Sequence, residues 1–183
     1  MSYIGVDEVG RGCLAGPMVV CAVLNSPLFN DFNLIDSKRL TSTKRRKLLR
    51  ELLPQVDFAI ASVSANFIDN FGISLAFREA LLQCYSNLSS RLHFCPYIID
   101  GRYKIDLKFD HRFEYKAEDQ YKAVALASII AKEFRDAYMR DLASSYSQYG
   151  FERHKGYGTM FHRKAIQKFG YTQIHRRSFK IKS

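Results

Sequence analysis

Residues 3–12 read YIGVDEVGRG, and this segment gives the most information about the fold of the chain. Along residues 3–9 the character of the side chains alternates, and some of them are β-branched, which is the pattern of a β-strand. Gly10 and Gly12 mark the end of this strand. Residues 17–24 (PMVVCAVL) form a continuous apolar run with three valines. The two segments together predict a hairpin of core strands.

The rest of the chain extends this hairpin into a layered domain. The sequence predicts further strands at residues 58–63, 96–100 and 112–116. It predicts helices at residues 41–53, from about residue 73, at residues 119–144 and at residues 160–169. We expect the longest helix to bury one face, formed by Ala127, Ile130, Ala131, Phe134, Tyr138 and Leu142. The first predicted strands lie together near the start of the chain, and we expect the helices to cover a mixed sheet. This arrangement indicates the α/β class.

Length and composition indicate one folded globular domain. The chain has 183 residues, of which 47% are hydrophobic and 25% charged, which excludes a disordered tail or a coiled coil. The longest uncharged run, residues 13–30, contains Pro17 and Pro27 and is too broken for a membrane span. The first residues lack the basic start of a secretory leader, and the four cysteines lack metal-binding spacing. We therefore expect four buried, reduced thiols in a cytoplasmic protein.

Positive charge is concentrated in two parts of the chain. The net charge is +10, and residues 151–183 hold nine Lys/Arg against one acid. Residues 38–50 form a second basic cluster that contains no acid. In the C-terminal stretch the cations alternate with aromatic side chains, a composition that suits contact with phosphates and sugars. The distribution favours a nucleic-acid partner, and residues 151–183 form a basic appendage of the domain.

Acidic residues stand at the ends of the predicted apolar strands. Asp7 and Glu8 lie in or at the end of the first strand, and Asp100 ends the strand at residues 96–100. Glu118 and Asp119 stand before the longest helix. Carboxylates gathered at one sheet edge repel each other, so they require a compensating positive charge. Oxygen ligands without His or thiolate neighbours favour Mg²⁺ or Mn²⁺.

Two points stay open when only the residue types are considered. Asp119 could equally serve as a residue that stabilises the start of the helix. Adjacent strand residues point to opposite faces, so Asp7 and Glu8 can serve one metal cluster only if the strand bulges or ends there. Gly10 and Gly12 permit such a break.

The motifs resemble those of the type 2 ribonucleases H, and of ribonuclease HII in particular. Residues 7–12 (DEVGRG) with residues 14–17 (LAGP) resemble the opening signature of that family. The later blocks follow in family order to residue 179, and they are DSKRL (36–40), IDG (99–101), ASIIAK (127–132), HKGYGT (154–159) and HRRSF (175–179). The resemblance therefore covers nearly the whole chain.

The resemblance implies a ribonuclease H-like mixed sheet flanked by helices, with a catalytic part at residues 1–150 and a small helical C-terminal extension at residues 151–183. It implies metal-dependent cleavage of the RNA strand of RNA/DNA hybrids, and nicking on the 5′ side of single ribonucleotides in duplex DNA. The products would carry 3′-OH and 5′-phosphate ends. In such a two-metal reaction the protein would use Mg²⁺ or Mn²⁺.

The same resemblance assigns roles to individual residues. The metal ligands would be Asp7, Glu8 and Asp100. The fourth acid is Glu118, ten residues before Ser128, or Asp119 if the helix starts one residue later. Gly10, Arg11 and Gly12 would bind substrate by reading the ribose 2′-hydroxyl. Tyr157 would pack against the neighbouring sugar, and Lys38 would contact phosphate.

Two alternatives remain at this point. Residues 116–118 (KAE) look more like the sister family ribonuclease HIII, which indicates a preference for long hybrids. A second alternative is a duplex-binding module on the same fold with no catalysis, although acids at the site would repel a polyanion. We expect a monomer that binds RNA/DNA hybrids and ribonucleotide-containing duplexes and no membrane, and the sequence identifies no protein partner.

Overall fold

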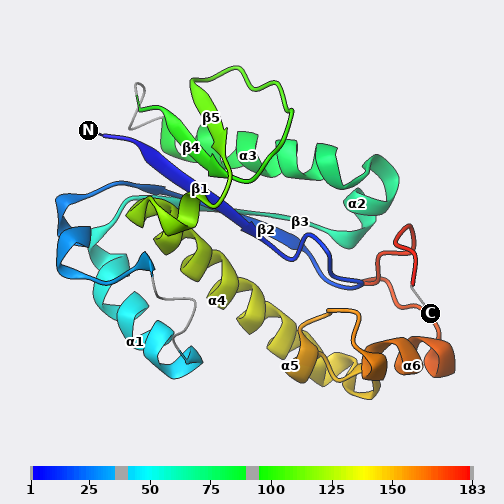
Figure 1. Cartoon of the computed structure of the whole chain (residues 1–183). Helices are drawn as coiled ribbons and strands as arrows, with labels where there is room; N and C mark the ends of the chain where they lie inside the picture. Colours follow the sequence, from blue (N-terminus) through cyan, green and yellow to red (C-terminus); the bar gives the residue numbers. More distant parts are fainter. Residues whose placement is uncertain (1, 36–40, 90–94, 182–183) are drawn as a thin grey trace.

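A five-stranded mixed sheet lies at the centre of the molecule (Figure 1). The computed structural model describes residues 2–35, 41–89 and 95–181. The DSKRL motif at residues 36–40, with Lys38, lies outside these described residues. The strands are β1 (Ile4–Val9), β2 (Met18–Leu24), β3 (Phe58–Val63), β4 (Tyr97–Asp100) and β5 (His111–Glu114).

The sheet has the strand order β3-β2-β1-β4-β5. β1 pairs antiparallel with β2, as the predicted hairpin requires, and β2 pairs antiparallel with β3. β1 also pairs in parallel with β4, which pairs in parallel with β5. The hairpin and the strand at residues 58–63 are confirmed, while β5 begins and ends earlier than the predicted residues 112–116.

Helices cover both faces of the sheet. They are α1 (Ser42–Leu52), α2 (Ala65–Phe71), α3 (Ile73–Ser89), α4 (Lys122–Ser145), α5 (Phe151–His154) and α6 (Met160–Phe169). Short 3₁₀ turns are η1 (Pro27–Asp31), η3 (Leu53–Gln55), η4 (Ala117–Asp119) and η5 (Ser147–Tyr149). The α2 helix was not predicted from the sequence.

The alternation of side chains along each strand divides the core into two layers. Val6 and Val20 pack on the α3 side, whereas Val19 and Cys21 pack on the α4 side. Figure 1 shows α3 and α4 on opposite sides of the strands, with α1 beside α4. Close packing of α4 on β1 requires Gly5, because a Cβ there would lie 2.3 Å from the Val124 nitrogen. The α/β prediction is confirmed.

The longest helix differs from its prediction in two respects. α4 begins at Lys122 rather than at residue 119, because η4 forms first, after Lys116 in a left-handed conformation. Near the sheet the predicted buried face of the helix is confirmed. The prediction is wrong for Phe134 (44% exposed) and Tyr138 (43% exposed), which face solvent. The second half of α4 contacts the loop after β1 and the C-terminal segment, and that contact buries Arg135 and Met139 instead.

The C-terminal segment packs against the end of α4. Buried side chains of α5 and α6, Phe151 and Ile166 among them, form a small apolar cluster with Leu14 and Met139. Figure 1 shows α5 and α6 beside the C-terminal half of α4. The division at residue 150 stays a prediction, since this cluster joins the two sides of it.

The cysteines and the helices bear on two other sequence predictions. Cys13, Cys21 and Cys84 are buried free thiols, whereas Cys95 is only half-buried, which corrects the expectation of four buried thiols. Cys95 lies two residues before β4, where it and Pro96 are both half-buried. Within the described ranges, no helix has the length and apolar character to cross a membrane.

Candidate active site

Three carboxylates from distant parts of the chain meet at one edge of the sheet. One oxygen each of Asp7, Asp100 and Glu118 lies within 4.8 Å of the others. β1 and β4 are parallel and in register, with Val6 opposite Ile99, so Asp7 and Asp100 follow side by side. Glu118 comes from η4, which directly follows the edge strand. The sheet topology therefore produces the convergence that the sequence predicted.

The position of Glu118 depends on a network of hydrogen bonds. The Ala117 N–H donates to Asp100 Oδ1 at 2.7 Å, which ties the start of η4 to the end of β4. Ser128 Oγ of α4 donates to Glu118 Oε2 at 3.3 Å. Asp119, the alternative fourth acid, is exposed on the same turn. The turn therefore brings Glu118, and not Asp119, into the group of three carboxylates.

Glu8 lies outside that group of three. The β1–β2 pairing continues regularly through Glu8 to Val9, where the strand ends, so the bulge that Gly10 and Gly12 would permit at residues 7–8 does not form. The Glu8 side chain therefore projects from the strand on the face opposite to that of Asp7. Its Oε1 accepts a hydrogen bond from the Tyr103 hydroxyl at 2.6 Å. Tyr103 was not singled out from the sequence, because nothing in its local pattern marks it.

The electrostatics of this edge favour a bound cation. Burial, together with the nearby charges of Glu8 and Glu118, raises the pKa of Asp7 well above its ordinary value. Burial likewise raises the pKa of Glu8, against the Tyr103 hydrogen bond and the Arg11 charge that lower it. An all-oxygen donor set in which like charges are crowded fits a hard divalent cation. Asp7, Asp100 and Glu118 could hold such an ion.

A cavity adjoins the carboxylates on the α4 side of the sheet. Its volume is about 250 Å³, and its lining includes Glu118, Ser128 and Lys132 and also Glu8, which reaches the rim of the cavity from the end of β1. Arg45 of α1 also lines it and forms an ion pair with Glu133 of α4, with an Nε–Oε1 distance of 2.8 Å. This member of the predicted basic cluster therefore holds α1 to α4. The other basic residues of α1 are exposed, and they are Lys44, Arg46, Lys47 and Arg50.

The loop after β1 carries the predicted substrate-binding glycines. Gly10 has a φ of 85°, and a Cβ there would lie 2.2 Å from Nε of Arg135, so only glycine fits. A Cβ at Gly12 would meet no described atom within 4 Å, and Gly12 is exposed. The loop thus presents open backbone at Gly12, three residues after the end of the strand that carries Asp7 and Glu8.

Two fully buried arginines hold this loop in place. Arg135 of α4 donates to the carbonyls of Ala15 at 2.9 Å and Pro17 at 2.8 Å. Arg176 donates to the carbonyls of Gly16 at 2.9 Å and Arg11 at 2.9 Å. Because these bonds satisfy buried carbonyl groups, they fix the loop backbone. Arg176 lies in the HRRSF motif and Arg135 lies three residues after the ASIIAK motif, yet a buried role could not be inferred from the sequence alone.

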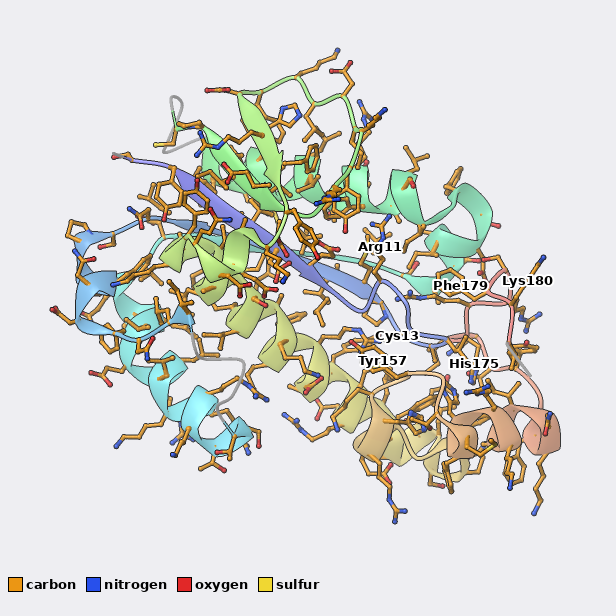
Figure 2. All side chains as sticks on the ribbon, in the orientation of Figure 1. Arg11, Cys13, Tyr157, His175, Phe179 and Lys180 are labelled. Atoms are coloured by element: carbon orange, nitrogen blue, oxygen red, sulfur yellow. The ribbon has the colours of Figure 1, made fainter. Side chains whose placement is uncertain are left out.

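Tyr157 follows α5 and borders the same loop. Tyr157 is 41% exposed, and its side chain lies against Cys13 (Figure 2). Cζ of Arg135 is 5.8 Å from the Tyr157 ring centroid. The ring therefore has one face against the protein and another side open to solvent. The open side leaves room for a substrate group against the ring.

The histidines of the C-terminal segment are structural. His162 and His175 are buried, and their Nε2 atoms lie 3.1 Å apart. His154 Nε2 lies 2.7 Å from the Tyr149 carbonyl oxygen, and the His154 ring stacks on the His162 ring. None of these rings reaches the carboxylates in the described part of the chain.

Comparison with known proteins identifies the family. The family model described as Ribonuclease HII matches residues 4–182. The chain is 39% identical to Ribonuclease HII of Aliarcobacter butzleri, with 98% of this chain and 91% of that protein covered. It is 42% identical to Ribonuclease HII of Chlamydia caviae, over 96% of this chain and 82% of that protein.

Solved structures show the same architecture. The crystal structure of ribonuclease H2 from Pyrococcus horikoshii OT3 superposes with a TM-score of 0.79 at 26% identity, and covers 99% of this chain and 95% of that one. The strand order and the flanking helices described above agree with this fold. The chain belongs to the ribonuclease HII family, the type 2 ribonucleases H that hydrolyse the RNA of RNA/DNA hybrids.

Proposed function

We propose that this enzyme nicks duplex DNA on the 5′ side of an embedded ribonucleotide, and also cleaves the RNA strand of longer hybrids, leaving 3′-OH and 5′-phosphate ends. The observation that carries the proposal is the convergence of Asp7, Asp100 and Glu118, with Asp7 on the strand that leads into the loop of Gly10, Arg11 and Gly12. A group of carboxylate oxygens of this kind suits a divalent cation, and a loop with exposed glycine backbone can approach a sugar closely.

The protein side chains divide the work of the reaction. Asp7, Asp100 and Glu118, with Glu8 from the opposite face, would hold the divalent cations. When held by these residues, Mg²⁺ or Mn²⁺ would supply the positive charge that lowers the pKa of an attacking water and stabilises a leaving 3′ oxygen. Asp7 is our choice for the ligand shared between the cations, because it is the most buried of the three converging acids.

The substrate would be recognised by backbone and aromatic contacts. Gly10, Arg11 and Gly12 would read the 2′-hydroxyl, and the open side of Tyr157 would pack against the neighbouring sugar. The exposed basic residues of α1 would contact phosphates without reading bases. Lys38 stays a prediction, as do the monomeric state and the cytoplasmic location.

The direct test is cleavage of a duplex that carries one ribonucleotide, with Mg²⁺ and with excess chelator. We expect nicking only with metal. Asp7→Asn and Glu118→Gln should each abolish nicking, whereas Asp119→Asn, which changes an exposed acid one residue away, should retain it. Normal turnover by Asp7→Asn would contradict the metal assignment, and loss of turnover in Asp119→Asn alone would transfer the fourth role to that residue.

Substrate preference separates this proposal from a ribonuclease HIII-like activity. The approach of Glu118, the acid of the KAE element, to Asp7 and Asp100 keeps that alternative open. We expect kcat/KM for the single-ribonucleotide duplex to be comparable with that for an all-RNA hybrid. A strong preference for the all-RNA hybrid would favour the alternative, and binding without cleavage of either substrate would indicate a non-catalytic module.

A further inference from the structure

Tyr103 makes a direct contact with one of the acids assigned to the metal site. It lies three residues after Asp100, in the loop that follows β4, and its hydroxyl donates to Glu8 Oε1 at 2.6 Å. This distance is short for a hydrogen bond between two oxygens, as expected when the acceptor is a carboxylate. The bond joins positions 95 residues apart in the chain.

The ring of Tyr103 is held in place by other rings. Its centroid lies 4.9 Å from that of Phe77 on α3 and 5.6 Å from that of Phe113 on β5, both in edge-to-face arrangements. The hydroxyl position is therefore set by two elements of the core, and not by the loop alone. A fixed donor gives the Glu8 carboxylate one preferred orientation.

Gly101 permits this placement. Its φ is 112°, and a Cβ at this position would lie 2.3 Å from Cε2 of Tyr103. Any side chain at residue 101 would push the tyrosine ring away from Glu8. The glycine of the IDG motif thus serves a packing purpose that can be seen in this chain.

Arg11 connects the tyrosine to the substrate-binding loop. Its Cζ lies 4.6 Å from the Tyr103 ring centroid and 5.6 Å from that of Phe77. Nη1 of Arg11 is buried without a hydrogen-bond partner among the described residues, so the aromatic faces are what hold this end of the guanidinium. Figure 2 labels Arg11 on the loop after β1, and the backbone of that residue is fixed by Arg176.

We propose that Tyr103 is a positioning residue for the metal site: its hydroxyl fixes one oxygen of Glu8 and leaves the other free for a divalent cation, and Arg11 links this arrangement to the loop that reads the ribose. A carboxylate offers about four lone-pair sites, so one hydrogen bond does not prevent metal binding. Hydrogen bonds to ligand side chains typically change metal affinity by 10- to 100-fold. The inference rests on the proposed role of Glu8 as a cation ligand.

The test measures Mn²⁺ binding to the substrate-free, full-length protein by isothermal titration calorimetry. Tyr103→Phe keeps the ring contacts and removes only the hydroxyl, and it should weaken Mn²⁺ binding about tenfold. Glu8→Gln should also weaken binding, and adding Tyr103→Phe to it should have no further effect. The matched control is Tyr115→Phe, because Tyr115 also lies under an arginine, with Cζ of Arg102 4.2 Å from its ring centroid, but is exposed.

The outcomes separate this inference from the proposed function. Weaker binding by Glu8→Gln with unchanged or tighter binding by Tyr103→Phe would overturn the role of Tyr103 and leave that of Glu8 intact. An equal loss from Tyr103→Phe in both backgrounds would show a general structural effect, which also overturns the positioning role. Unchanged binding by Glu8→Gln would instead remove Glu8 from the metal site, and this inference would fail with it.

Discussion

Acidification should weaken the fold through two buried histidines, His162 of α6 and His175 beyond it. The Tyr157 carbonyl can only accept, so His162 Nδ1 carries a hydrogen and Nε2 is left as an acceptor at 3.1 Å from His175 Nε2. His175 donates there, and its Nδ1 accepts from the Thr172 N–H at 2.9 Å. A proton added to either ring would place a donor against a donor.

The size of the effect follows from the pKa values. Burial lowers the pKa of His162 and of His175 from an ordinary value of 6.5 to about 4. The unfolded chain therefore takes up protons as the pH falls below 6.5, while the folded protein does so only near 4. At pH 5 this difference lowers the free energy of unfolding by roughly 2 kcal/mol per histidine. For the pair the loss is roughly 4 kcal/mol, a large fraction of a typical domain stability.

Urea unfolding at pH 7 and pH 5, in the presence of chelator, measures this loss. The wild type is compared with His175→Gln, which keeps an N–H donor toward His162 but cannot be protonated, and with His111→Gln on the edge strand β5. The variant at position 175 should lose about 2 kcal/mol less than the wild type between the two pH values. The His111 variant should behave like the wild type.

Other titrating groups act on all three proteins alike. The raised pKa of Asp7 has the opposite sign, because the folded protein binds its proton more tightly than the unfolded chain, and it stabilises the fold as the pH falls. That contribution cancels when variants are compared with the wild type. Identical pH dependence for the wild type and His175→Gln would refute the assignment of neutral, buried imidazoles.

Three further predictions concern the substrate loop, the ribose contact and the metal site. Arg176→Lys should lower the free energy of unfolding by about 3 kcal/mol, as measured by urea unfolding, because a lysine cannot reach the carbonyls of Gly16 and Arg11 together. The same variant should raise KM in steady-state nicking, because the substrate loop is then less firmly held. Tyr157→Phe should reduce the ratio of cleavage of a one-ribonucleotide duplex to that of the all-DNA duplex, and equal ratios would count against a sugar contact. Asp7→Asn should raise the urea midpoint in chelator at pH 7, because it removes a buried charge that is repelled by its neighbours, and a lower midpoint would contradict this electrostatic origin.

The strands and most helices could be predicted because their signals are local. β3 has the predicted bounds, and α1 is capped by Thr41, whose Oγ1 accepts from the Lys44 N–H at 3.4 Å. The missed helix α2 also has such a cap, since Ser64 Oγ accepts from the Phe67 N–H at 3.2 Å. Its seven residues are too few to show a clear helical period.

The choice between Glu118 and Asp119 could not be made from the sequence. Both are acidic and adjacent, and both stand at the predicted start of the longest helix. What separates them is the left-handed backbone of Lys116 together with the bond from the Ala117 N–H to Asp100. A turn of this kind depends on a contact between positions 17 residues apart, and residue patterns within a window do not contain it.

The same limit explains why the exposed rings of α4 were misplaced and why Tyr103 was missed. Helical periodicity predicts one buried face, but it assumes that a single neighbour covers the whole helix. Here the sheet covers the first half of α4, and residues 14–17 with the C-terminal segment cover the second, so the buried face shifts from Ala131 to Arg135 and Met139. Tyr103 likewise gains its role only when β1 and β4 lie side by side and bring its hydroxyl to Glu8. The acids proposed to bind a cation are predictable from chemistry, whereas the residues proposed to orient them depend on the tertiary packing.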